Sequence, residues 1–473
     1  MNESILLFMS IVVLVAGLSS LNWRVAVKVS LVLVIVEGAL RKWVLPQASD
    51  MVYFLKDVVF FGAYVRYFLL DRISHNAYRL RQVKTLAVLA SFVVVAQAFN
   101  LRMNSPLVGI VGVKAYLGYI PLCFMVPSLF KSVEELEGFL KRYILIAIPV
   151  CVLGIVQFET PFSSPLNTYV VNDTARIATF GTHNNPRITG TFSFTSGHGT
   201  YMFVSLVLIV VLLSVRQPIW WKVLLTTTAV LVVGNTFMTG SRGPAFAAAL
   251  FIVSFLLSSQ LGRRVKSRPR LGPLILVALA GAFSCIYWFD EAFLAFWYRA
   301  NNSNDFQYRV VNDMLEPFHS LYAEEWSGFG TGSTHQGGFA LRDRLRLSTS
   351  YQAPPPFEEE PRRVLLELGI PGFALWYCLR VYLVVALWRT WQQLRTAVLR
   401  NLALAACLVH AIQILGQLVF NPTFAVYYWF VTGFVFLLPK IDRIAKIKGA
   451  QGLPSLGRNH WSRPSLISSG RYF

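Results

Sequence analysis

The sequence predicts an all-α fold: a polytopic membrane protein with about 12–14 transmembrane helices and two long loops on one side of the bilayer. Three observations predict it. Of the 473 residues, 55% are hydrophobic and 14% are charged, whereas ordinary soluble domains have about 25% charged residues. Apolar stretches recur along the whole chain, and one helical crossing needs roughly 20 such residues. The basic residues gather in alternate loops. A soluble globular enzyme is therefore excluded.

Residues 1–440 are expected to form one integral membrane helical domain, and residues 441–473 a cytoplasmic, disordered tail. Two connections within the domain are long, at about 159–199 and about 290–363. Long loops on a rigid scaffold are where function concentrates. The expected spans lie near residues 5–21, 25–40, 52–70, 86–100, 107–129, 144–158, 200–214, 220–238, 244–259, 274–289, 364–388, 402–419 and 423–439.

The distribution of charge predicts how the chain lies in the bilayer. The formal net charge is +20, from 43 Lys and Arg against 23 Asp and Glu. In a soluble protein this excess would suggest a nucleic-acid partner, but retention of basic loops in the cytoplasm explains it better. We therefore expect a lipid bilayer and no nucleic acid as partner. The C-terminus is expected in the cytoplasm, with the N-terminus and both long loops outside. The first apolar run lacks a basic start and contains Glu3, so we expect a retained span.

Some polar and reactive residues are expected to have only structural roles. Ser132–Tyr143 has the pattern of a short amphipathic helix on the cytoplasmic face. Five cysteines lie in apolar stretches without a CxxC motif, which is typical of small core residues. Charged residues within spans are costly and need partners, and Glu37 and Arg41 have the spacing of a helical ion pair. The other such residues are Lys28, Lys56, Asp57, Lys114 and Arg380.

The sharpest local motif is Thr239–Pro244, just before an expected span. Pro244 suits the first position of a helix, so the N–H groups at the start of that helix would lie beside the Arg242 guanidinium at the outer face. Such an arrangement binds phosphate. In the alternative interpretation, Arg242 reaches toward lipid headgroups.

The first outer loop ends in Arg187–Phe192, which leads directly into a span. Arg187, close to a glycine and just above the bilayer, could contact a second phosphate or a sugar, or the segment could be a plain re-entry turn. His198 follows as a further candidate for substrate binding. The spacing of His183 and His198 matches no zinc pattern, so hydrogen-bonded loop histidines are favoured. We expect no metal and no cofactor.

The second outer loop combines arginines, carboxylates and an aromatic residue. Its glycine run, Gly328–Gly332, is not a nucleotide-binding motif, because the spacing is wrong and no Lys-Ser or Lys-Thr follows. Carboxylates and arginines beside an aromatic ring suit sugar binding and general base catalysis, although each residue could also be a solvated loop residue. The candidates are Arg309, Trp326, His335, Glu358, Glu360 and Arg362.

Taken in order, these motifs resemble the O-antigen ligase and O-antigen polymerase superfamily of bacterial envelope glycosyltransferases. Three features carry the resemblance: Arg187–Phe192, Ser241–Gly243, and a long loop that contains Gly328–Gly330 and closes with Glu367–Gly372. With the order of the spans, it covers roughly residues 140–440. The segment Glu37–Trp43 also resembles an N-terminal feature of some uncharacterised members.

The resemblance implies metal-independent, inverting transfer of an undecaprenyl-diphosphate-linked glycan on the periplasmic side of the bacterial inner membrane. The acceptor would be a glycan or a lipid-linked acceptor, for O-antigen or exopolysaccharide assembly. Family arginines that hold the diphosphate correspond to Arg242 and Arg309. Where ligases have a loop histidine as base, this sequence has Glu358. The base is therefore Glu358 or Glu360, or else His335. Whether the chain acts as a polymerase or as a ligase stays open.

The expected chemistry fits these residues. Arginines and a helix N-terminus would stabilise the departing diphosphate, and a glutamate within an acidic triplet would have a raised pKa suited to a base. Two alternatives belong to other classes: a transporter or flippase of lipid-linked saccharide, and a non-catalytic scaffold of a polysaccharide export complex with other assembly proteins as partners. Transporters place polar sites near the bilayer midplane. Here polar residues gather in outer loops, which favours the enzyme.

Overall fold

The computed structural model describes residues 3–71, 81–103, 105–170, 186–261, 326–344 and 359–450, and the isolated residues 272, 294, 297 and 346. The described residues form helices and connecting turns, so the predicted all-α class is confirmed. The longer elements are α1 (Glu3–Leu21), α2 (Trp23–Ala39), α4 (Leu55–Tyr64), α5 (Arg81–Ala98), α6 (Pro106–Leu117), α7 (Ile120–Leu129), α8 (Val133–Leu145), α9 (Ala147–Glu159), α10 (Thr195–Leu213), α11 (Ile219–Met238), α12 (Arg242–Leu261), α17 (Gln336–Arg344), α18 (Glu360–Gln393), α19 (Ala397–Ile412), α20 (Pro422–Thr432) and α21 (Phe434–Ala450).

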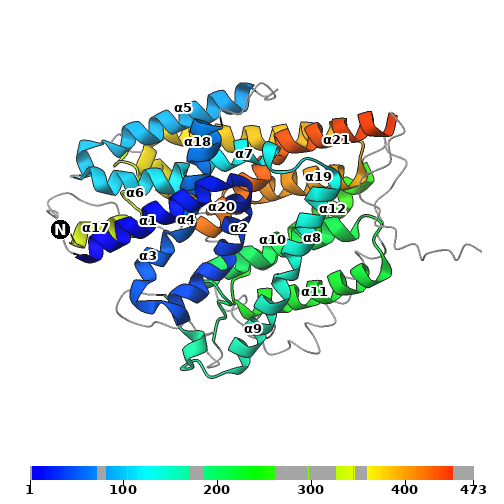
Figure 1. Ribbon diagram of the computed structural model, residues 1–473, viewed down its shortest axis with the longest axis horizontal. Helices are drawn as coiled ribbons and strands as arrows, with labels where there is room; N and C mark the ends of the chain where they lie inside the picture. The colour runs from blue at the N-terminus through cyan, green and yellow to red at the C-terminus, as the bar shows by residue number, and fades with distance from the viewer. Residues whose placement is uncertain are drawn as a thin grey trace, which may run out of the picture.

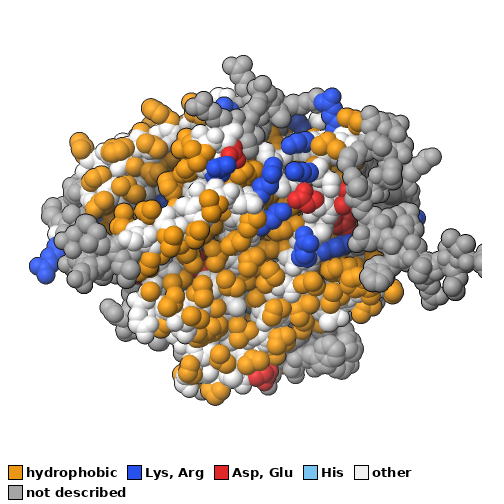
Figure 2. Space-filling view, in the orientation of Figure 1, with side chains coloured by type: hydrophobic (Ala, Val, Ile, Leu, Met, Phe, Trp, Pro, Cys, Tyr) orange, Lys and Arg blue, Asp and Glu red, His pale blue; other side chains and the backbone are white. Residues whose placement is uncertain are grey.

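The chain is a multi-pass membrane protein. Within the described ranges, six helical segments are long and apolar enough to cross a bilayer, and four shorter apolar helices accompany them. Much of the face in Figure 2 is hydrophobic, while its Lys and Arg side chains gather in one area. The expected span at 274–289 lies outside the described residues. The six segments are Pro106–Leu129, Val133–Glu159, Thr195–Leu213, Ile219–Met238, Glu360–Gln393 and Pro422–Ile447.

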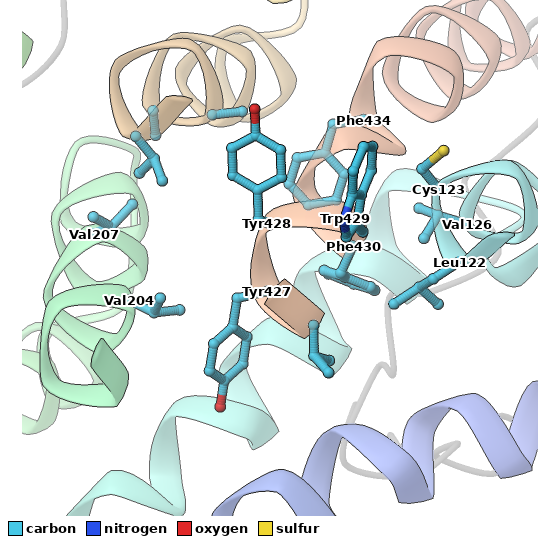
Figure 3. Packing of buried hydrophobic residues seen from close by; sticks show 14 of the residues in the cluster. Leu122, Cys123, Val126, Val204, Val207, Tyr427, Tyr428, Trp429, Phe430 and Phe434 are labelled. Atoms are coloured by element: carbon cyan, nitrogen blue, oxygen red, sulfur yellow. The ribbon is translucent and has the colours of Figure 1, made fainter. Parts of the chain in front are cut away.

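The long helices form a bundle around one large apolar core. α18 packs against α19 and α5, and α10 packs against α11 and α12 (Figure 1). α20 lies between α10 and α7, where Tyr427 and Val204 lie on one side of the helix and Leu122 on the other (Figure 3). Two tyrosines pair within this core, where the hydroxyls of Tyr143 and Tyr427 lie 2.7 Å apart.

Every charged residue expected to need a partner within a span has one. The pair predicted from spacing, Glu37 and Arg41, is confirmed at 3.9 Å, but Lys56 lies nearer to Glu37, at 2.6 Å. The pair of Glu37 with Lys56 joins α2 to α4. Pairing offsets the cost of removing charge from water. The remaining pairs are Lys114 with Asp57 at 2.9 Å, Lys28 with Glu135 at 3.4 Å, and Arg380 with Glu360 at 2.6 Å.

Two predicted segments differ in detail from the structure. The amphipathic helix expected at 132–143 is α8, where the Ser132 hydroxyl accepts from the Glu135 N–H at 3.2 Å. Its apolar face, with Leu136 and Phe139, packs into the protein, and the chain continues directly into α9. α21 extends the helical domain past residue 440 to Ala450, and residues 451–473 lie outside the described part. The cysteines Cys123, Cys151, Cys378 and Cys407 are free thiols, while Cys285 is not described.

A sharp break divides α18 at Gly369, whose φ of 66° and ψ of 179° are not helical. Glu360 and Arg380 are 20 residues apart in sequence, yet their side chains are 2.6 Å apart. In a straight helix, 20 residues would span about 30 Å. The chain must therefore turn back at Gly369, so that Glu360–Leu368 lies alongside the following helix.

The glycine run of the second long loop covers this break. The Phe329 N–H donates to the Leu366 carbonyl at 2.7 Å, and the Gly330 N–H donates to the Glu367 carbonyl at 3.1 Å. Backbone groups freed by a helix break need such partners within a membrane. Gly328, Gly330 and Gly332 all have positive φ, from 68° to 102°, a conformation that glycine adopts without strain.

The same segment is anchored to α5 and α6. The Thr331 hydroxyl donates to the Val94 carbonyl at 2.8 Å, and the Thr331 N–H donates to the Gln97 carbonyl at 3.1 Å. A Cβ atom placed on Gly112 would lie 2.4 Å from the Gly332 nitrogen. The segment 326–335, which we call the glycine plug, is thus largely buried and has a structural role. Its first residue, Trp326, is 62% exposed.

Replacing Gly332 with alanine should strongly destabilise the protein. The new Cβ would lie 2.6 Å from the Val108 carbonyl oxygen, at a backbone φ of 91°. Clash and strain together should cost about 3 kcal/mol or more. The measurement is thermal unfolding of the detergent-purified protein. Gly138→Ala on α8 is the control, since its Cβ would meet nothing within 4 Å. Equal unfolding temperatures for the two variants would contradict the tight packing of the plug.

Candidate anion site and the loops that hold it

The two arginine motifs from separate parts of the sequence meet in the structure. The Ile188 N–H donates to the Met238 carbonyl at 3.2 Å. Arg187 Nε donates to the Thr239 carbonyl at 2.9 Å. Thr239 lies in the turn between α11 and α12, where Gly240 has a φ of 61°. Arg187 is therefore held at the turn that leads directly into Arg242.

This turn places positive charge at the start of α12. The helix begins at Arg242 rather than at Pro244 as predicted, so the partly buried Arg242 lies in the first turn. The Thr239 hydroxyl accepts from the Ser241 N–H at 3.1 Å. The N-terminal ends of α10 and α12 are in contact, because a Cβ on Gly199 would lie 2.7 Å from Pro244 Cγ. The positive end of the helix dipole and two guanidinium groups suit an anion.

Lys42 is a further basic residue at this end of the bundle and was not among the candidates predicted from the sequence. Its Nζ donates to the Thr189 hydroxyl at 2.9 Å and to the Gly190 carbonyl at 2.7 Å. Lys42 is 7% exposed, and burial lowers its pKa to about 7. Arg41 Nη1 donates to the Ser193 hydroxyl at 3.0 Å. In the sequence, only the resemblance of the whole Glu37–Trp43 segment to a feature of some family members pointed to this region.

His198 packs under the first long loop, and its expected role in substrate binding stays a prediction. It is fully buried, and its Nε2 lies 3.3 Å from Asn235 Oδ1. Gly190 packs directly on the His198 ring, where a Cβ would lie 2.5 Å from Nδ1. On the other side, Gln157 Oε1 accepts from the Gly190 N–H at 2.7 Å. The turn at Thr189 and Gly190 is therefore held on several sides.

A second polar cluster ties the glycine plug to the first half of α18. Glu367 Oε1 accepts from the N–H and the hydroxyl of Thr334, at 2.9 and 2.7 Å. Arg363 Nη2 donates to the Thr334 carbonyl at 2.7 Å. The guanidinium carbon of Arg363 lies 3.2 Å from the centre of the Phe420 ring. These contacts fix the end of the second long loop relative to the helix bundle.

Glu360, which the sequence offers as a candidate base, has contacts on both of its carboxylate oxygens in the structure. One carboxylate oxygen pairs with Arg380 at 2.6 Å, and the other accepts from the Val419 N–H at 2.6 Å. Arg380 also donates to the carbonyls of Gln413 and Gly416. A base must reach the acceptor hydroxyl, whereas Glu360 is buried and both of its oxygens are engaged.

The other candidates of the second loop are dispersed or lie outside the described residues. Trp326 is exposed at the start of the plug, and Arg362 is partly buried in the first turn of α18. Arg309, Glu358 and His183 lie outside the described residues. Within the described ranges, no three His, Cys, Asp or Glu side chains are grouped to hold a metal ion.

His335 lies at the end of the plug, where its ring centre is 6.0 Å from that of Phe420. The Gly337 N–H donates to its Nδ1 at 3.0 Å, so the neutral ring carries its proton on Nε2. Burial, with smaller contributions from Lys114 and Arg363, lowers the pKa of His335 to about 4. At neutral pH this histidine therefore presents a donor rather than a free base.

Acidification should destabilise the wild type more than a His335→Gln variant. Because the pKa of His335 is about 4 in the folded protein and about 6.5 when unfolded, only the unfolded state binds a proton between these values. Stability is therefore highest above about pH 6.5 and falls toward pH 4, by up to about 3 kcal/mol. Thermal unfolding of both proteins at pH 7 and pH 4 measures this. A parallel loss in both would contradict the buried, neutral histidine.

Among known protein families, residues 227–377 match the family model described as O-antigen ligase. The predicted resemblance is thereby confirmed. The O-antigen ligase match begins within α11, includes the Arg242 turn and the glycine plug, and ends within α18. Arg187 and Lys42 lie outside the matched region. Arg187 contacts it at Thr239, and Lys42 contacts the turn that follows Arg187. Comparison with the curated proteins and with the solved structures finds no match.

Proposed function

We propose that this chain is a membrane glycosyltransferase of the O-antigen ligase and polymerase type. It transfers or polymerises an undecaprenyl-diphosphate-linked glycan on the periplasmic face of the inner membrane. The observation that carries the proposal is the meeting of Arg187 with the turn that begins α12 at Arg242, through the 2.9 Å bond to Thr239. The O-antigen ligase match over 227–377 supports the same assignment.

The chemistry requires stabilisation of a leaving diphosphate. An acceptor hydroxyl attacks the anomeric carbon of the donor, the bond from that carbon to the diphosphate oxygen breaks, and the configuration inverts. Arg187, Arg242 and the N-terminus of α12 supply positive charge where negative charge develops on the departing oxygen. We also assign Arg309 to the diphosphate, because it corresponds to a family arginine that holds this group.

The acceptor hydroxyl must lose a proton as it attacks. Glu360 is engaged in its ion pair, and the Nδ1 of His335 accepts a backbone hydrogen bond. Glu358, which stands at the position of the ligase histidine, is therefore our proposed base. The exposed Trp326 ring is proposed to stack on a sugar. Arg362, at the start of α18 and close in sequence to Glu358, is proposed to contact the substrate as well.

The test is the lipid-linked and surface glycan profile of cells that lack the chromosomal copy and carry wild type or Arg242→Ala at matched protein levels. Accumulation of single repeat units on the lipid carrier identifies a polymerase, and accumulation of full-length chains on the carrier identifies a ligase. Arg389→Ala is the control, because Arg389 is exposed on α18 beyond the break. A wild-type profile for Arg242→Ala would refute the proposal.

A further inference from the structure

The segment Glu37–Trp43, at the end of α2, has no part in the chemistry proposed above, yet it is attached closely to the first long loop. A Cβ placed on Gly38 would lie 2.5 Å from the Thr191 carbonyl oxygen, so the two backbones are in direct contact. Trp43 Nε1 donates to the Pro165 carbonyl at 3.1 Å. The segment thus holds both the early and the late part of this loop.

Lys42 makes the most specific of these contacts. Its two hydrogen bonds both end on the turn at Thr189 and Gly190, at 2.9 and 2.7 Å. No ion pair of Lys42 is present in the part of the chain that the structure describes. A buried amine is costly unless its donors are satisfied, and here the loop accepts two hydrogen bonds from it.

The turn held by Lys42 is connected directly to Arg187. Ile188, between Arg187 and Thr189, pairs with the Met238 carbonyl at 3.2 Å, and Arg187 itself bonds to Thr239. A shift of Thr189 would therefore also move Arg187, two residues earlier in the chain, and its guanidinium group. Misplacement of a binding group by about 1 Å can reduce a rate about 100-fold.

We propose that Lys42 is a positioning residue, which holds the turn at Thr189 and Gly190 and so fixes Arg187 against the start of α12. The inference rests on the proposed function at one point, the binding of the diphosphate by Arg187. The Glu37–Trp43 segment would then connect α2 to the anion site and hold that site in place.

The first measurement is amide hydrogen exchange over residues 187–193 in the purified full-length protein in nanodiscs, without ligand. Lys42→Met should raise exchange in this segment at least about tenfold, because the turn loses two hydrogen bonds. Lys28→Met is the matched control, since Lys28 lies in α2, which leads into the segment of Lys42, and is paired with Glu135. Equal exchange in the two variants would overturn the proposal.

The second measurement is titration of undecaprenyl diphosphate into the same nanodiscs. Lys42→Met should weaken binding about tenfold or more, and Thr189→Val, a milder change, should weaken it less. If Lys42 acts through Thr189, the double variant binds no more weakly than Lys42→Met alone. Additive losses would show that Lys42 and Thr189 act on binding independently, which overturns the proposed action of Lys42 through Thr189.

The two proposals fail in different ways. If Arg187→Ala and Arg242→Ala bind undecaprenyl diphosphate as the wild type does, the proposed function is refuted. Hydrogen exchange over 187–193 in Lys42→Met still decides whether Lys42 fixes the loop, because that measurement needs no ligand. If residues 187–193 exchange as slowly in Lys42→Met as in Lys28→Met, the inference is overturned even if both arginine variants lose binding.

Discussion

Arg242→Ala is expected to reduce glycan transfer by about 100- to 1,000-fold, the usual cost of removing one positioned charge donor from a site where negative charge develops. Arg242 lies in the first turn of α12, where the helix dipole acts in the same direction. Arg242→Lys should recover only part of the rate, because an ammonium group cannot bind an anion through two parallel bonds. The measurement is the amount of long-chain surface glycan per molecule of folded protein.

Arg187→Ala should also impair transfer, with an additional effect on the loop. Its side chain bonds to the Thr239 carbonyl, so its loss affects the turn that begins α12 as well as the anion. Full transfer by both arginine variants, at normal protein levels, would contradict an anion site at this turn. Arg389→Ala, on the exposed part of α18, should transfer as the wild type does.

Removing one partner of the buried pair between Glu360 and Arg380 is expected to cause the largest loss of stability. Glu360→Ala leaves the Arg380 guanidinium buried without its carboxylate, and Arg380→Ala leaves the carboxylate. Such changes cost about 3–5 kcal/mol. Thermal unfolding of the purified protein measures the loss. A double variant, Glu360→Gln with Arg380→Met, should recover much of it, because no uncompensated charge remains.

The same variants separate a structural from a catalytic role for Glu360. Our account predicts that the folded fraction of Glu360→Gln with Arg380→Met still transfers glycan, because neither residue acts on the acceptor. A stable double variant without transfer would restore Glu360 as the base. A single Glu360→Gln variant with normal stability and no transfer would lead to the same conclusion.

Much of the fold followed from local features of the sequence. The apolar runs predicted the helical class, and the spacing of Glu37 and Arg41 predicted their pair. Charged residues within spans have strong physical reasons to be paired, so their structural role could be predicted before the partners were known. The residues of the amphipathic helix at 132–143 were also recognisable from their pattern.

The arrangement of the site could not be predicted in the same way, because it depends on contacts between distant segments. Glu360 stands in an acidic triplet that reads as solvated, and only the break at Gly369 brings Arg380 to it. Glycine followed by Pro371 within an apolar run was a signal for that break. The structural role of the glycine run could not be predicted, because its partner carbonyls, at Leu366 and Glu367, lie far along the chain. Lys42 has no local feature that marks its contact with Thr189.

The central claim is that Arg187 and Arg242 hold one diphosphate at the start of α12. Its most direct test is titration of undecaprenyl diphosphate into nanodiscs that contain wild type, Arg187→Ala or Arg242→Ala, with undecaprenol as the control ligand that has the same tail and no phosphate. The account predicts that each variant binds the diphosphate about tenfold or more weakly and binds undecaprenol as the wild type does. Equal diphosphate binding by all three proteins would contradict it.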